Sequence, residues 1–440
     1  MYQIVEDLQK DQRNLVCVIK PIDYQFEGIL ELFNSTVSRS MKGFIAQSLW
    51  KYLVYTELAA TLYEEMNSRP IHYHFSNDET KLLEYIRQHE GIVVHDFAIR
   101  LERIIRDVMS SGSNQLPTIE DQQSRVSEIL HNKVLRDLVD KLTNVLNDKN
   151  SVFVLVDNLD KAWQYREDID VLSKFLFGLF SVGELITKDF GSKSYRRKSI
   201  ELSLVLFLRS DIFAHIKHHA REKDKLDYTR MTWNDIHMLQ RVIEERFVNS
   251  LGTKIPRLQV WTDYFVPTVG GIETKYYIAS RVIPRPRDII HLCRLALRYA
   301  INRNHNIIEE IDIMDAEKEY SQHAYDSALV EMEVEYKEIK VLVDSFAGEN
   351  SIISKEQLAN ILKIANVPEP EYEKVVELLI DTTVLGREIS PDKFDFTYDE
   401  NRKDVLRIQG LKTALRQGLE RYQINVPFRA YLGIINDPSE

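Results

Sequence analysis

Hydrophobic residues follow two different patterns along this chain. Residues 14–20, 151–156 and 202–208 are short, almost continuous apolar runs rich in valine, leucine and isoleucine. Runs of this length are typical of strands that are buried on both faces of a sheet. Between them, apolar residues recur every three or four positions, the spacing of one helix face. Buried strands that alternate with helices predict an α/β fold with a parallel sheet.

The helical patterns lie on both sides of each predicted strand and continue beyond them. In the first half of the chain they cover residues 26–66, 80–87, 97–109, 121–147 and 169–186, with a loop at 110–117. After about residue 224 the strands stop, and helices are predicted at 233–249, 287–302 and 311–343. Near the C-terminus, helices at 354–364 and 371–382 precede strands at 384–388 and 394–398, which is the order of a winged helix.

These changes of pattern predict three domains. Residues 1–223 form the α/β part, residues 224–346 an all-helical part, and residues 347–440 a winged-helix-like part. A chain of 440 residues is long enough for two or three domains that each bury a core of their own.

Composition and charge narrow the functional classes. No apolar run approaches the length of roughly 20 residues that a membrane span needs, and the polar, acidic start does not resemble a secretory signal, so we expect a cytoplasmic protein. The net charge of −11 gives no general attraction to nucleic acid, which would need a local basic patch. Cys17 and Cys293 lie in apolar patterns and are predicted to be buried thiols.

Two aspartates follow the second predicted strand directly. Asp157 would stand at the carboxyl end of a buried parallel strand, where open α/β sheets bind their ligands, and could hold Mg²⁺ through water. Asp160 would then polarise an attacking water or complete the outer shell of the metal. The alternative is structural, because Asp and Asn also favour strand-ending turns and helix caps.

Arg209 follows the third predicted strand in the same way. A fixed cation at that edge is suited to sensing the terminal phosphate of a nucleotide. In the alternative interpretation Arg209 pairs with Asp211 or another carboxylate and only anchors the strand end.

Together, the motifs VFVLVDNLD, LVLFLRSD and Arg285-Pro-Arg287-Asp resemble bacterial P-loop ATPases of the AAA+/STAND kind, in the branch found near phage-defence and mobile elements. The resemblance covers about residues 14–320. It implies ATP and Mg²⁺ as ligands, a Walker B role for Asp157 and Asp160, and a sensor 1 role for Arg209. It also implies that the helical part is a lid whose Arg287, next to Arg285, contacts the nucleotide as sensor 2.

One expected motif is missing. The sequence contains no G-x-x-x-x-G-K-[ST] phosphate loop, and the imitations at residues 183–194 and 269–275 have the wrong spacing or context. Either Met1 is an internal methionine of a longer natural protein, or the chain is naturally truncated and works without nucleotide.

Three functions therefore remain open. The first is an ATP-dependent molecular switch, catalytic only when a phosphate loop completes it. The second is a non-catalytic interaction or scaffold protein that uses the same fold, with a second copy or another protein as its partner. The third is a winged-helix DNA-binding regulator, which the acidic helix predicted at residues 371–382 disfavours.

Overall fold

The computed structural model divides the chain into two compact units, Met1–Tyr228 and Thr229–Glu440. Each unit buries a hydrophobic core of its own. The residues that the structure describes are 1–20, 39–93, 133–159, 169–190, 200–209, 212–213, 216–217, 228–229, 231–251, 256–257, 259–333, 336–396 and 403–436. Within these ranges every helix is too short or too polar to cross a membrane.

The first unit is built around a three-stranded parallel sheet, as the apolar runs predict. Its strands are β1 (Leu15–Ile19), β2 (Val152–Val156) and β3 (Leu202–Leu206), and they lie in that order. Cys17 pairs with Val154, which in turn pairs with Leu204, so the three strands are in register along their whole length. Because side chains alternate along a strand, these three residues share one face of the sheet.

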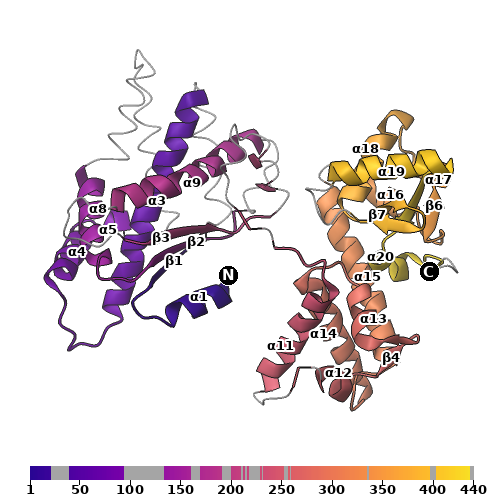
Figure 1. Cartoon of the computed structure of the whole chain (residues 1–440), viewed down its shortest axis with the longest axis horizontal. Helices are drawn as coiled ribbons and strands as arrows, with labels where there is room; N and C mark the ends of the chain where they lie inside the picture. The colour runs from indigo at the N-terminus through magenta and orange to yellow at the C-terminus, as the bar shows by residue number, and fades with distance from the viewer. Residues whose placement is uncertain are drawn as a thin grey trace. The chain divides into compact units, whose positions relative to one another are not determined.

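Helices cover that face. Figure 1 shows the long helix α3 (Arg39–Asn67) and α9 (Ile169–Phe190) running over the sheet, with α1 (Tyr2–Gln9) near β1 on the other side. The remaining helices of the unit are α4 (Asn77–Gln88), α5 (Glu90–Val93) and α8 (Lys133–Leu146). The predicted helix at 97–109 and the loop at 110–117 lie outside the described residues.

Helices α3 and α9 cross at close range. A Cβ atom added at Gly178 of α9 would lie 2.6 Å from the Cβ of Ala46 on α3, well inside van der Waals contact. Nearby, the indole of Trp50 donates a 3.0 Å hydrogen bond to the backbone oxygen of Phe175, and the two rings stack at 4.8 Å. Gly178 and Ala46 therefore let the two helices approach closely enough for the rings of Trp50 and Phe175 to stack.

The second unit begins with helices that pack around α14 (Pro286–Arg303) and α15 (Glu310–Met332). These are α11 (Ile236–Leu251), α12 (Gln259–Tyr264) and α13 (Thr274–Ser280), with a small hairpin of β4 (Thr268–Val269) and β5 (Ile272–Glu273). The prediction of one helix over residues 311–343 is wrong, because α15 ends at Met332 and a new helix, α16 (Ile339–Asp344), follows. The turn redirects the chain so that Ile339 and Leu342 are buried beside the next helix.

The rest of the second unit contains a four-stranded antiparallel sheet in the order β6-β9-β7-β8. Its elements in chain order are β6 (Ile352–Ser354), α17 (Lys355–Ile364), the short 3-10 helix η4 (Glu369–Glu371), α18 (Tyr372–Asp381), β7 (Leu385–Ser390), β8 (Lys393–Asp395), α19 (Lys403–Gln417), β9 (Arg421–Ile424) and α20 (Val426–Leu432). The two helices and two strands predicted here are confirmed. Strand β9, which the sequence pattern does not reveal, lies between β6 and β7.

Candidate functional site

Asp157 lies at the carboxyl edge of the parallel sheet. Its backbone N–H donates a 3.0 Å hydrogen bond to the oxygen of Ile19, and the N–H of Phe207 donates a 2.9 Å bond to the oxygen of Val156. The ladder therefore continues for one residue past the three strands, and their carboxyl ends lie level. Asp157 follows the middle strand and Arg209 follows its neighbour, so both emerge from the same edge of the sheet.

The backbone after Asp157 turns sharply. Asn158 has a φ of 65°, in the left-handed region that asparagine tolerates better than most residues, and Leu159 is fully buried. The turn buries Leu159 in the core while Asp157 stays half-buried at the edge. Among the residues that the structure describes, no side chain bonds to the carboxylate of Asp157. Asp160 lies outside the described residues.

Arg209 is exposed and begins the segment that leads from β3 into the next helical turn. Its carbonyl oxygen accepts a 3.0 Å hydrogen bond from the N–H of Phe213, and Ile212 and Ile216 are fully buried in the core. The backbone at Arg209 is therefore held by a turn and by two apolar anchors. Asp211, its alternative partner, lies outside the described residues, so the choice between phosphate sensor and structural ion pair stays a prediction.

Strand β3 has an outer edge that pairs with no described strand. The oxygen of Glu201 accepts from the N–H of Val152 at 2.8 Å, which shows that odd-numbered residues direct their backbone groups toward β2. Leu202, Leu204 and Leu206 direct theirs to the other side. The strand carries neither proline nor charge, the usual protections of an edge, and Val205 is 38% exposed.

Arg285 and Arg287, the predicted sensor 2 residues, are both exposed at the start of α14 in the second unit. The hydroxyl of Tyr320 on α15 donates a 2.8 Å hydrogen bond to Asp288 and accepts a 3.0 Å bond from the N–H of Ile283. Burial raises the pKa of Asp288, against the opposing effects of the Tyr320 hydrogen bond and the charge of Arg285. Tyr320 thus links α15 to Ile283 and Asp288, which lie on either side of the arginine pair in the sequence.

Sequence reasoning missed Tyr320, whose only signal is an aromatic residue within a strongly charged helical pattern. The structure places Asp157 and Arg209 on one sheet edge of the first unit, and Arg285 and Arg287 on one helix start of the second. Whether the two pairs meet around a nucleotide stays a prediction.

In their described residues, neither imitation of a phosphate loop has the required strand-loop-helix context. Residues 183–190 belong to the middle and end of α9. Residues 269–273 form the tight β4–β5 hairpin, in which Gly270 and Gly271 take positive φ values of 56° and 81°. A phosphate is ringed by backbone amides only where a loop leaves a strand and opens a helix, so the described parts of both segments are unsuited to that role.

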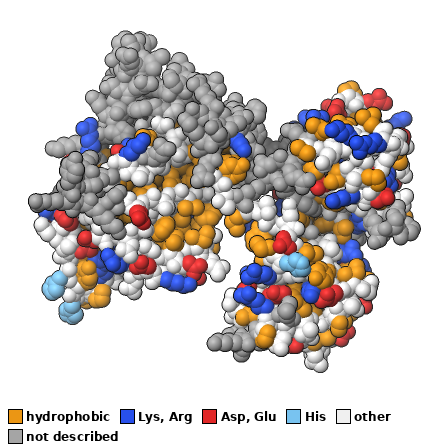
Figure 2. All heavy atoms as spheres, viewed as in Figure 1, with side chains coloured by type: hydrophobic (Ala, Val, Ile, Leu, Met, Phe, Trp, Pro, Cys, Tyr) orange, Lys and Arg blue, Asp and Glu red, His pale blue; other side chains and the backbone are white. Residues whose placement is uncertain are grey.

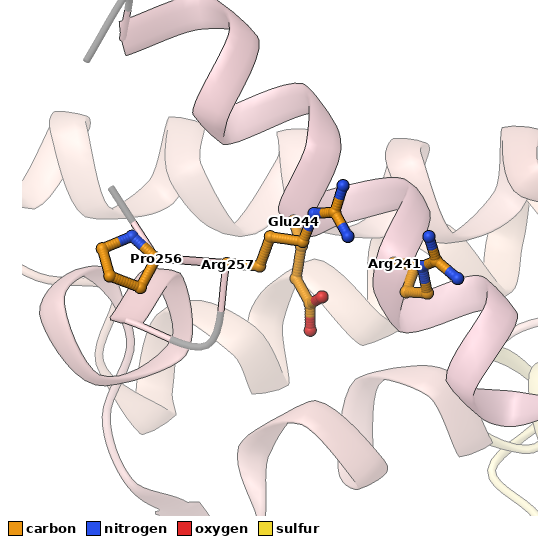
Figure 3. A pocket seen from close by; sticks show the side chains of 4 residues that line it. All are labelled: Arg241, Glu244, Pro256 and Arg257. Carbon is orange, nitrogen blue, oxygen red and sulfur yellow. The ribbon is translucent and has the colours of Figure 1, made fainter. Parts of the chain in front are cut away.

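A cavity of about 490 Å³ lies in the second unit, lined by Arg241 and Glu244 of α11 together with Pro256 and Arg257 (Figure 3). The carboxylate of Glu244 is already used, because it accepts a 2.9 Å hydrogen bond from the indole of Trp261. Arg257 pairs with Glu245 at 2.5 Å. None of the predicted site residues lines this cavity.

Comparison with known proteins finds a similar family for one part of the chain. Residues 237–329 are similar to a family described as the FunZ-associated C-terminal helical domain. This segment runs from α11 to the last turn of α15 and so contains the cavity, the arginine pair and Tyr320. No curated protein and no solved structure matches the chain.

Proposed function

We propose that this chain supplies the metal-binding and phosphate-sensing side of an ATP-dependent molecular switch, in the manner of P-loop ATPases of the AAA+/STAND kind. The observation that carries the proposal is the shared carboxyl edge of β2 and β3, from which Asp157 and Arg209 both emerge. Open parallel sheets bind their ligands outside this edge. An acid at this edge can bind the metal cation, and a cation on the neighbouring strand can bind the phosphate anion.

The proposal assigns a role to each residue. Asp157 holds Mg²⁺ through water, Asp160 orients the attacking water, and Arg209 stabilises the charge on the terminal phosphate. Arg285 and Arg287 approach the nucleotide from the helical part when the switch closes. Bound Mg²⁺ and ATP supply the phosphoryl chemistry, and the protein contributes position and charge.

The side chains fit the metal better than they fit the phosphates. The half-buried carboxylate of Asp157, with no bond to another described side chain, suits a hard cation. The amide cradle for the phosphates, however, has no counterpart in the 440-residue sequence. The edge of β3 that no described strand pairs with is the place that we propose for it, because a parallel strand added there would end beside Asp157 and Arg209.

The test is nucleotide binding by the full chain, followed with a fluorescent ATP analogue during a Mg²⁺ titration. Without the amide cradle we expect weak binding, with an affinity on the order of 1 mM, that strengthens with Mg²⁺. Asp157→Asn should abolish the strengthening, and Arg209→Ala should weaken binding about tenfold. Asp148→Asn and Arg13→Ala, exposed residues at the amino end of the strands, are matched controls and should change nothing.

Binding that ignores Mg²⁺, or that survives both edge substitutions, would contradict the proposal. No binding by the wild-type chain at millimolar ATP would instead favour the second candidate, a non-catalytic scaffold. The specific observation for that candidate is the missing phosphate loop itself.

The C-terminal part supports a docking role in either case. We infer a winged-helix-like module from the order of α16, β6, α17, α18 and the β7–β8 hairpin, with β9 inserted into the sheet. Helix α18, in the place of a DNA-reading helix, carries Glu373, Glu377 and Asp381 but only one lysine. These acids would repel phosphates, so we propose that the module binds protein and predict no salt-dependent shift with duplex DNA.

A further inference from the structure

Helix α19 shows an apolar stripe to solvent. Val405, Ile408, Leu411 and Leu415 are 51%, 46%, 44% and 84% exposed. Their spacing of three, three and four residues places them on one side of the helix along about 15 Å of its length. A contiguous exposed stripe of large aliphatic side chains on a surface helix is the usual mark of an interaction site.

The opposite side of α19 is already used. Leu406, Gly410 and Thr413 are buried against strand β7, and the hydroxyl of Thr413 donates a 2.8 Å hydrogen bond to the oxygen of Ile389. A Cβ atom at Gly410 would lie 2.5 Å from the Cδ of Arg387, so this contact is tight. The helix is therefore held by one face, and the exposed stripe is not needed to attach it to the domain.

Positive charge flanks the stripe on both sides. With 100° between successive residues, Arg407 falls on one side of the stripe and Arg416 on the other, while Lys412 falls near the Arg416 side, between Ile408 and Val405. All three are exposed, and none forms an ion pair within the described part of the chain. Figure 2 shows hydrophobic and basic side chains next to one another over the region where Figure 1 labels α19. Three exposed cations on one helix stand out in a chain whose net charge is −11.

We propose that this stripe is the docking site of an acidic amphipathic helix from a partner protein. An apolar seam with charges on both flanks is the arrangement by which paired helices choose their partners, and cations on one helix select acids on the other. A second copy of α19 is disfavoured, because it would face these three cations with three more. A membrane surface is disfavoured because α19 has none of the aromatic residues that anchor interfacial helices.

The proposal is independent of nucleotide binding and is tested on the full chain with a designed probe. The probe is a fluorescent helical peptide of about 20 residues, with leucine along one face of the helix and glutamate on both sides of that face. A second peptide replaces every glutamate with lysine. Fluorescence anisotropy should show binding of the acidic peptide in the micromolar range at low salt, about tenfold weaker binding in 0.5 M salt, and no binding of the basic peptide.

Two double variants test the contributions of the apolar stripe and of its flanking cations separately. The pair Ile408→Ser and Leu415→Ser should weaken acidic-peptide binding at least about tenfold. The pair Arg407→Glu and Arg416→Glu should reverse the preference, so that the basic peptide binds and the acidic one does not. Ile301→Ser, which removes a 65% exposed isoleucine from α14, is the matched control and should bind as the wild type does.

All substituted positions are exposed, so each variant should keep the wild-type melting temperature, which is measured first. Failure of the acidic peptide to bind the wild type, or equal binding to the serine variants, overturns the proposal. So does dimerisation that Leu415→Ser abolishes, which would make a second copy the occupant. Binding to anionic vesicles that the same substitution abolishes, without peptide binding, would make a membrane surface the occupant.

Discussion

At the scale of single residues, the turn after β2 depends on Asn158. Its positive φ of 65° positions Asp157 at the sheet edge and Leu159 in the core. Asn158→Gly should leave the free energy of unfolding within about 0.5 kcal/mol of wild type, because glycine adopts this conformation freely. Asn158→Val should cost about 1–2 kcal/mol, because a β-branched residue is strained there. Urea denaturation measures both, and equal costs would contradict the strained turn.

Asp312 is a buried carboxylate that accepts several hydrogen bonds. Its side chain is fully buried and accepts hydrogen bonds from Arg303 at 2.8 Å, from His305 at 2.8 Å and from the N–H of Glu309 at 3.0 Å. Burial alone would raise the pKa of Asp312, but the bonds from His305, Arg303 and Glu309 outweigh it and hold the pKa below its ordinary value. These bonds join the end of α14 to the start of α15.

A lowered pKa means that Asp312 stabilises the fold when charged. The contribution is complete above the unfolded pKa of 3.8 and is lost as pH falls through the lower pKa of the folded state. Asp312→Asn should therefore lower the free energy of unfolding by about 2 kcal/mol at pH 7, and the difference should shrink at strongly acidic pH. Thermal melts of both proteins from pH 7 down to about pH 2 check this, and a difference that stays constant below pH 3.8 would point to lost packing instead.

The candidate site was predictable from sequence where it depends on local pattern. Asp157 and Arg209 follow apolar strands, and both facts are visible in the letters of the sequence. The contribution of Tyr320 was not visible, because it bonds to Ile283 from 37 residues away, and only the packing of α14 on α15 brings the two together. Side chains that hold a site from a distance leave no local signature.

At the scale of secondary-structure elements, the crossing of α3 and α9 gives two glycines of α9 different tolerance to an added methyl group. Gly178→Ala should cost about 1–3 kcal/mol, because the added methyl group would overlap Ala46. Gly183→Ala, whose new Cβ would lie 3.5 Å from Leu204, makes an ordinary contact and should stabilise the helix by up to about 1 kcal/mol. Equilibrium unfolding in urea measures both, and Ala46→Gly should partly rescue Gly178→Ala but not help Gly183→Ala.

The three buried strands, and helices such as α14, were predicted within a few residues, whereas the starts predicted at residues 26 and 121 lie outside the described residues. The break between α15 and α16 was missed because the charged, aliphatic pattern continues across residues 333–338 without glycine or proline. Strand β9 was missed because RYQI is short and alternates polar with apolar residues only once or twice. Its identity as a strand comes from pairing with β6 and β7. The register pairs Ile352↔Gln423 and Arg387↔Tyr422 are 71 and 35 positions apart in the sequence.

At the scale of the whole molecule, the two units have separate cores that share no residue. We therefore expect residues 229–440 to fold when produced alone. Circular dichroism should show a cooperative thermal transition for this fragment, at a temperature close to one of two transitions in the full chain. A fragment without a cooperative transition would show that the second unit needs the first, and the fragment 1–228 provides the reciprocal comparison.

The position of β9 also orders events during synthesis. Because Arg421–Ile424 separates β6 from β7, β6 has no native neighbour in the sheet, and β7 has only β8, until residue 424 has left the ribosome. Until then β6 and one edge of β7 present unpaired backbone groups, and apolar side chains such as Ile353 and Leu385 lack part of their core. During this interval the incomplete sheet can bind chaperones. It can also pair with the same strand of another nascent chain on the same mRNA.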